Sequence, residues 1–164
     1  MPRKPEPHDL LIALLLVQNS LERNSETFFQ PYGLTSAQFN ILNLLAYREG
    51  RMEQSALVEL LLVGKSSISI VLNRMVRDGL VSREEHPKDR RQVILILTSK
   101  GRALWRKISP RYEASVQKVL GALPTSRRQP FMDDLKLLHE ALTNAEESTE
   151  SSAHWDALFS KLED

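Results

Sequence analysis

The sequence contains no cysteine. This absence excludes disulfide frameworks, thiolate metal sites and cysteine-based redox sensing, and it fits a reducing compartment. Long hydrophobic runs are missing too: the longest, Leu10 to Val17, has eight residues, against the roughly 20 that a membrane-spanning helix needs. Arg3 and Lys4 precede this run, as in a signal peptide, but Asp9 borders it and no small-residue cleavage site follows. The sequence therefore predicts a cytoplasmic protein.

Motifs for metal binding and catalysis are also scarce. None of the four histidines forms a metal-spaced pair with another. Gly64, Lys65 and Ser66 match the end of a phosphate-binding loop, but position 59 holds Glu59 where that loop needs a glycine. No G-x-S-x-G nucleophile elbow is present. The sequence predicts no metal, no cofactor and no enzymatic activity.

Charge is distributed unevenly, although the formal net charge is only +1. The segment 65–111 holds twelve lysines and arginines against four acidic residues, and the rest of the chain is acidic on balance. A basic block inside an otherwise acidic chain indicates a surface directed at a polyanion. A merely solvated basic surface would give the same count, so charge alone leaves both interpretations open.

Hydrophobic periodicity predicts a mainly α protein with a small β-hairpin. Helices are expected over 9–30, 35–47, 54–62, 65–77, 99–120 and from Pro130 to about 143, and strands over 80–83 and 93–97. Thr35 and Gln38 have the spacing of a capping box. Gly79 takes a helix C-terminal position, and Thr98 can cap the long helix, which Pro110 is expected to kink. Residues 146–164 are expected to form a polar linker and a short amphipathic tail.

The first predicted helix, residues 9–30, is apolar on almost every side in its first two turns. Such a helix must be covered on every side, and a chain of this length offers too little cover. We therefore expect a homodimer built from the helices at 9–30, 111–121 and 130–143. The side chains expected in the dimer contact are Leu11, Leu15, Phe131, Leu135 and Leu138.

Two short helices joined by a tight turn and followed by a hairpin with a basic tip make a winged helix-turn-helix. In this motif the N-terminal residues of the second helix reach base edges in the major groove. Here these residues are one cation and three small hydroxyl side chains: Lys65, Ser66, Ser67 and Ser69. The side expected to be buried carries Ile68, Val71, Leu72 and Met75. An ordinary amphipathic helix with a serine-rich start explains the helix equally well when it is taken alone.

The hairpin decides between these interpretations. From Leu34 to about Leu104 the sequence resembles, without a gap, the MarR (multiple antibiotic resistance regulator) family. The matching segments are LTSAQFNIL, VGKSSISIVLNRMVRDGLVSR and HPKDRRQVILILTSKG. The resemblance implies a winged helix-turn-helix over 34–98, with dimerisation helices at 9–30 and 99–145. The flanking helices resemble the family's dimerisation layer only in position and amphipathicity.

The resemblance implies a dimeric transcription regulator that binds double-stranded DNA at a pseudo-palindromic operator. Repression is the commoner outcome in the family, and a small aromatic or anionic effector often releases the DNA. The aromatics expected near such an effector site are Phe28, Phe29, Tyr47, Trp105 and Tyr112, for which simple packing is the alternative. The competing function is a winged-helix protein-interaction or architectural module without operator specificity.

The resemblance also assigns roles to single residues. It places Ser66, Ser67, Ser69 and Arg74 at the major groove and its phosphate walls, and Arg90 in the adjacent minor groove. Lys65, Lys88 and Arg91 complete the predicted DNA-binding set. Asp89 is expected to hold the shape of the wing by pairing with a neighbouring arginine, with Arg91 as the first choice. Two residues depart from the family pattern: Gly64, often a serine N-cap, and Ile70, commonly polar. The apolar Ile70 side chain can touch a thymine methyl group.

Overall fold

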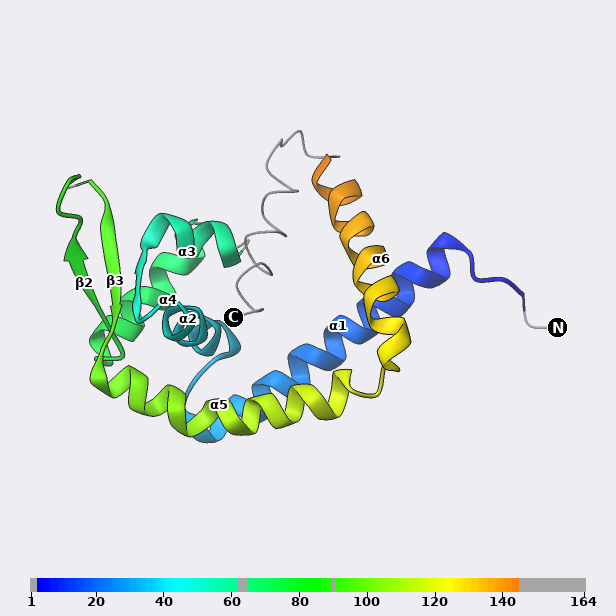
Figure 1. The fold of residues 1–164 in the computed structure, drawn as a ribbon, viewed down its shortest axis with the longest axis horizontal. Helices are drawn as coiled ribbons and strands as arrows, with labels where there is room; N and C mark the ends of the chain where they lie inside the picture. Colours follow the sequence, from blue (N-terminus) through cyan, green and yellow to red (C-terminus); the bar gives the residue numbers. More distant parts are fainter. Residues whose placement is uncertain (1–2, 62–64, 90, 145–164) are drawn as a thin grey trace.

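The chain forms a winged-helix lobe joined to an elongated helical layer (Figure 1). The structure, a computed structural model, describes residues 3–61, 65–89 and 91–144. Its elements are α1 (Pro7–Phe29), η1 (Gln30–Tyr32), α2 (Ser36–Tyr47), β1 (Arg51–Glu53), α3 (Gln54–Leu61), α4 (Lys65–Arg77), β2 (Val81–Glu85), β3 (Val93–Leu97), α5 (Ser99–Leu120) and α6 (Thr125–Asn144). The predicted class, mainly α with a small hairpin, is confirmed. In the described ranges, no helix has the length and apolar character needed to cross a membrane.

Helix ends follow the predicted capping signals. The Gln38 backbone N–H donates to Thr35 Oγ1 at 3.2 Å, and the Thr35 N–H donates to Gln38 Oε1 at 2.9 Å, so the capping box is present. Gly79 follows α4 with a φ of +70°, a left-handed conformation that glycine adopts without strain. Thr98 Oγ1 accepts from the Gly101 N–H at 3.0 Å and caps α5. The winged-helix lobe therefore begins and ends its main helices where its sequence signals predicted.

A three-stranded antiparallel sheet completes the lobe, with β3 between β1 and β2. The short strand β1 was missed in the sequence because three residues, Arg-Met-Glu, carry no β-rich pattern of their own. Pairing with β3 specifies it, with Met52 opposite Leu95. The helices and the apolar β3 share one core, in which Phe39, Leu42, Leu45, Leu57, Leu72, Met75, Leu95 and Ile108 are fully buried.

Two of the long helices contain an internal proline, and only one of them departs from the sequence prediction: α5 spans Ser99–Leu120 as expected. The predicted start of the last helix was wrong: α6 begins at Thr125 and contains Pro130. A proline in this position removes one intrahelical hydrogen bond, and the residues of this turn are exposed. The helix α5 runs through Pro110 without ending there. Neither Pro110 nor Pro130 marks an end of its helix, whereas α1 begins at Pro7.

Gly101, in the first turn of α5, supplies a test of how closely the hairpin packs on this helix. A Cβ at this position would collide with the Leu80 backbone carbonyl and the Leu97 side chain. Gly101→Ala should therefore lower the free energy of unfolding, although alanine favours a helix interior by about 1 kcal/mol over glycine. The control is Ala103→Gly at an exposed position of the same helix, which should cost about 1 kcal/mol. Urea unfolding of both variants measures these changes, and a more stable Gly101→Ala variant would contradict the packing.

Candidate nucleic-acid interface

Helix α4 is divided into a buried side and an exposed side. Ile68, Leu72 and Met75 lie in the core and Val71 is partly buried, as predicted. The opposite side carries Ile70, which is 73% exposed, and the exposed side chains Asn73, Arg74 and Arg77. These residues recur every three or four positions and form one stripe along the helix. The exposed stripe therefore combines an apolar side chain with amide and guanidinium groups. Such a surface favours a partner that carries both methyl groups and hydrogen-bond acceptors.

The predicted site residues fall on α4 and on the hairpin. Ser69 is half-buried on α4, and Lys88 and Arg91 are exposed at the hairpin tip. The first turn of α4 contains Lys65, Ser66 and Ser67, whose side chains lie outside the described part. Three further predicted parts lie wholly outside it: Gly64, Arg90 and the tail at 146–164. Where side chains are described, the predicted residues thus form two groups, one on the helix and one on the wing.

A hydrogen bond joins α4 to the hairpin. Arg83 Nη1, on β2, donates to Asn73 Oδ1, on α4, at 2.8 Å. Asn73, Arg77 and Arg83 were all missed in the sequence. The helical spacing from Ser69 to Asn73 and Arg77 could have revealed two of them, but no sequence signal pairs Arg83 with Asn73. This contact links the wing to the exposed stripe of α4.

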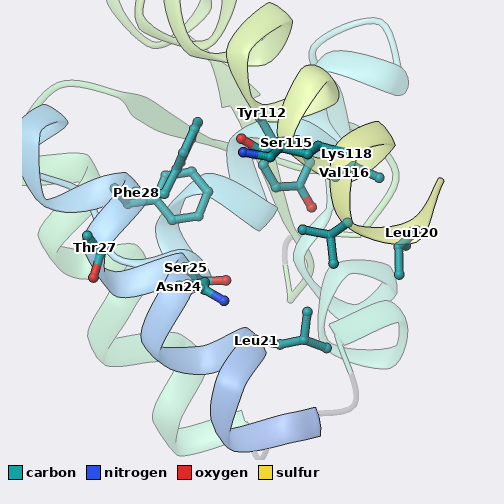
Figure 2. A pocket seen from close by; sticks show the side chains of 12 residues that line it. Leu21, Asn24, Ser25, Thr27, Phe28, Tyr112, Ser115, Val116, Lys118 and Leu120 are labelled. Atoms are coloured by element: carbon teal, nitrogen blue, oxygen red, sulfur yellow. The ribbon is translucent and has the colours of Figure 1, made fainter. Parts of the chain in front are cut away.

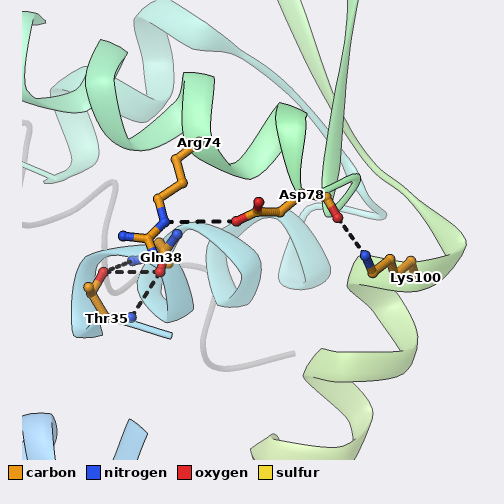
Figure 3. Close-up of polar contacts among 5 residues, drawn as sticks. All are labelled: Thr35, Gln38, Arg74, Asp78 and Lys100. Atoms are coloured by element: carbon orange, nitrogen blue, oxygen red, sulfur yellow. Dashed lines mark hydrogen bonds and ion pairs between the residues drawn. The ribbon is translucent and has the colours of Figure 1, made fainter. Parts of the chain in front are cut away.

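Arg74 and the end of α4 are held by further polar contacts, which Figure 3 shows. The Arg74 Nε lies 3.9 Å from Asp78 Oδ2, and both side chains are at least half exposed. Lys100 Nζ, from α5, donates to the Asp78 backbone carbonyl at 2.6 Å. An exposed ion pair such as that of Arg74 contributes little to stability. Arg74 can therefore exchange the carboxylate for another oxyanion at little cost.

Hydrogen bonds to the backbone shape the described part of the hairpin tip. Asp89 Oδ1 accepts from the backbone N–H of Arg91 at 3.0 Å, and no ion pair joins these two described side chains. The first choice for that pairing, the Arg91 guanidinium, is therefore wrong, and the other neighbouring arginine, Arg90, lies outside the described residues. The carboxylate satisfies the nearby main chain, as aspartate commonly does in turns. The Arg91 guanidinium consequently stays exposed at the tip.

The helical layer contains a pocket between α1 and α5 (Figure 2). Its volume is about 490 Å³, within the range of small-molecule sites. The lining is mainly apolar, with a few polar groups: Leu21, Asn24, Ser25, Thr27, Phe28, Phe29, Tyr112, Ser115, Val116, Lys118, Val119 and Leu120. Burial raises the pKa of Tyr112 above its usual value of 10.0, which keeps its hydroxyl protonated at neutral pH. The pocket thus combines an apolar wall with a neutral phenol and one lysine.

The aromatics expected near an effector divide into two sets. Phe28, Phe29 and Tyr112 line the pocket, and Phe29 and Tyr112 also contact Phe39 of α2, with ring centroids 4.7 and 4.8 Å apart. Tyr47 and Trp105 do not line it. They contact each other at 6.3 Å, and Trp105 Nε1 donates to Asn43 Oδ1 at 2.9 Å. The first set connects the pocket with the winged-helix lobe, and the second packs between α2 and α5.

A broad apolar surface covers α1 and α6. The large apolar side chains at least about two fifths exposed on these helices are Leu10, Leu11, Ile12, Leu14, Leu15, Leu16, Val17, Leu21, Phe131, Leu137, Leu138 and Leu142. Leu135, also expected in a dimer contact, is half-buried. Helix α6 packs little on the rest of the described chain. A surface this large and apolar indicates an interface.

Comparisons with known proteins agree with this architecture. A family model described as MarR family matches residues 32–92. The transcriptional repressor YetL of Bacillus subtilis is 27% identical over 136 residues, which cover 82% of this chain and 81% of YetL. The crystal structure of Sco3205, a MarR family regulator from Streptomyces coelicolor in complex with DNA, superposes with a TM-score of 0.76 over 93% of this chain and 96% of Sco3205, at 22% identity.

A second solved structure is similar in sequence as well as in fold. AbsC, a MarR family transcriptional regulator from Streptomyces coelicolor, is 31% identical, with a TM-score of 0.78. The similarity covers 87% of this chain and 99% of AbsC. It therefore includes the helical layer that the family model leaves out. The chain belongs to the MarR family of transcriptional regulators.

Proposed function

We propose that this protein is a homodimeric repressor that binds a specific DNA operator and releases it when a small effector binds. The observation that carries the proposal is the joined surface of α4 and the wing: Asn73 on the exposed stripe bonds to Arg83 on β2, and the same hairpin carries the exposed Lys88 and Arg91 at its tip. A helix in the major groove beside a cationic wing is how this motif binds duplex DNA. The fold is that of Sco3205, solved in complex with DNA, and YetL is named a repressor.

We assign base reading to α4 and charge to its flanks. Ser66, Ser67 and Ser69 face base edges, and Ile70 contacts a thymine methyl group. Arg90 enters the minor groove. The phosphate contacts belong to Lys65, Arg74, Lys88 and Arg91. The geometry that supports this division is the exposure of Ile70 and Arg74 on α4 and of Lys88 and Arg91 on the wing.

We assign residues 34–98 to DNA binding and the helices at 9–30 and 99–145 to dimerisation. The apolar surface of α1 and α6 is what a second copy of the chain would cover. The proposed contact residues are Leu11, Leu15, Phe131, Leu135 and Leu138. A two-fold dimer places its two recognition helices about one helical turn apart. The proposal includes a cytoplasmic location, where chromosomal DNA lies, and no catalytic activity.

Footprinting of the purified protein on the DNA around its own gene tests the proposed function. We expect protection of a pseudo-palindrome whose half-sites lie about 10 bp apart, centre to centre. Protection without any sequence preference would favour the protein-interaction or architectural module instead.

The pocket between α1 and α5 is the proposed effector site, because its apolar wall suits a small aromatic compound and its lysine suits an anionic one. Val116→Trp should fill the pocket and leave operator binding intact, while it weakens the response to benzoate or phenol at least about tenfold. Fluorescence anisotropy of a labelled operator during titration with these two compounds measures both effects. Lys107→Trp, exposed on α5 and not among the pocket residues, is the control. An unchanged response in Val116→Trp, where wild type responds, would place the effector elsewhere.

A further inference from the structure

Asn73 holds a central place on the exposed stripe of α4, one turn beyond Ser69 and Ile70. Its side chain is exposed, and its Oδ1 accepts a hydrogen bond of 2.8 Å from Arg83 Nη1. The two residues are ten positions apart, because β2 returns past the recognition helix directly after the turn at Gly79. A side chain on the DNA-facing stripe is thus held by a residue of the wing.

The chemistry of this bond sets the orientation of the asparagine amide. A guanidinium has only donors, so the group that faces Arg83 must be the amide oxygen. The amide NH₂ of Asn73 is then the group left to face a partner. An asparagine that reads adenine uses both groups, with its NH₂ donating to N7 and its oxygen accepting from the N6 amino group. Here the oxygen is engaged by a cation, and that positive charge disfavours the approach of a base amino group.

We propose that Arg83 is a positioning residue that makes Asn73 a reader of hydrogen-bond acceptors, and that the base opposite Asn73 in each half-site is guanine or thymine and not adenine. Guanine presents N7 and O6, and thymine presents O4, without an amino donor in the major groove. This inference rests on the proposed operator binding. It goes further by naming which bases occupy one position of each operator half-site.

Selection of binding sites from a pool of randomised duplexes tests this inference. Wild type should enrich guanine or thymine at one position per half-site, and Asn73→Ala should flatten the preference at that position alone. Arg83→Met removes the donor and the charge, so the freed amide oxygen should shift this position toward adenine by about threefold to tenfold. Asn73→Asp keeps a partner for Arg83 but replaces the amide donor with an acceptor, so it should lose the preference for guanine or thymine and favour a base with an amino donor, above all cytosine.

The matched control is Arg77→Met, which removes the same charge from the exposed side of α4 and leaves the Arg83–Asn73 bond in place. It should weaken binding to all sequences without changing the base preferred at any position. If Arg83→Met behaved like this control, Arg83 would not position Asn73 and the inference would be wrong. If Asn73→Ala weakened all sequences equally, Asn73 would contact phosphate, and the inference would be wrong as well. A wild-type protein that enriches no sequence would overturn both the inference and the proposed operator binding, whereas an enriched motif with no change at any position in Asn73→Ala would overturn the inference alone.

Discussion

Leu15→Glu combined with Leu138→Glu should convert the protein from a dimer into a monomer and lower its affinity for the operator by at least about a hundredfold. The two leucines are 49% and 44% exposed on α1 and α6, within the apolar surface that we assign to the dimer. A carboxylate buried there without a partner is strongly unfavourable. The affinity falls because a dimer engages its second half-site at a high effective concentration, which commonly contributes two to four orders of magnitude.

Sedimentation equilibrium at micromolar concentration and operator titration measure the two effects on the same preparations. Tyr47→Glu is the control. Tyr47 is a large exposed side chain, 58% exposed, at the end of α2, and it lies outside the dimerisation helices and their apolar surface. This variant should leave the dimer intact. A wild-type chain that stays a folded monomer under these conditions would refute the assignment of this surface, and so would a double variant that remains dimeric.

Neutralising the wing tip with Lys88→Ala and Arg91→Ala should weaken binding to nearly all DNA sequences and reduce its dependence on salt. Each lost phosphate contact lowers the slope of log K against log salt by about 0.9 unit, so four contacts per dimer correspond to about four units. The shape of the tip should survive, because Asp89 is bonded to the backbone N–H of Arg91 and not to its side chain.

Operator affinity measured between about 50 and 200 mM salt gives this slope. Arg106→Ala with Lys107→Ala removes the same charge from exposed positions of α5 outside the wing, and this control should keep most of the wild-type slope. If the wing variant and the control had the same slope, the effect would come from net charge and the wing would not touch DNA.

Local signals predicted the winged-helix lobe well because they act over a few residues. The capping box at Thr35 and Gln38 and the left-handed Gly79 need only their own neighbours to form. The apolar spacing of Ile68, Leu72 and Met75 likewise determined which side of α4 is buried. Strand β1 escaped prediction because its pairing with β3 comes from a segment about forty residues away, which no local pattern encodes.

The site was predicted only in part, for a similar reason. Sequence and family resemblance placed Ser69, Ile70 and Arg74 on the recognition helix, and the structure shows Ile70 and Arg74 exposed there. They did not reveal the bond between Asn73 and Arg83, because it depends on the path of β2 past α4. Asp89 was expected to pair first with the Arg91 guanidinium, but it accepts a hydrogen bond from the Arg91 backbone N–H. A carboxylate in a tight turn commonly bonds to a nearby main-chain donor in this way.

The measurement that tests operator reading most directly is the ratio of two affinities of the purified dimer, for its selected operator and for a scrambled duplex of the same composition, at the same salt concentration. Operator-specific regulators bind their sites about 10³-fold or more tighter than other DNA. We expect a ratio of at least that order, and a loss of most of it when the half-sites are moved apart by half a helical turn. A ratio near one at every salt concentration would contradict sequence-specific regulation by this protein.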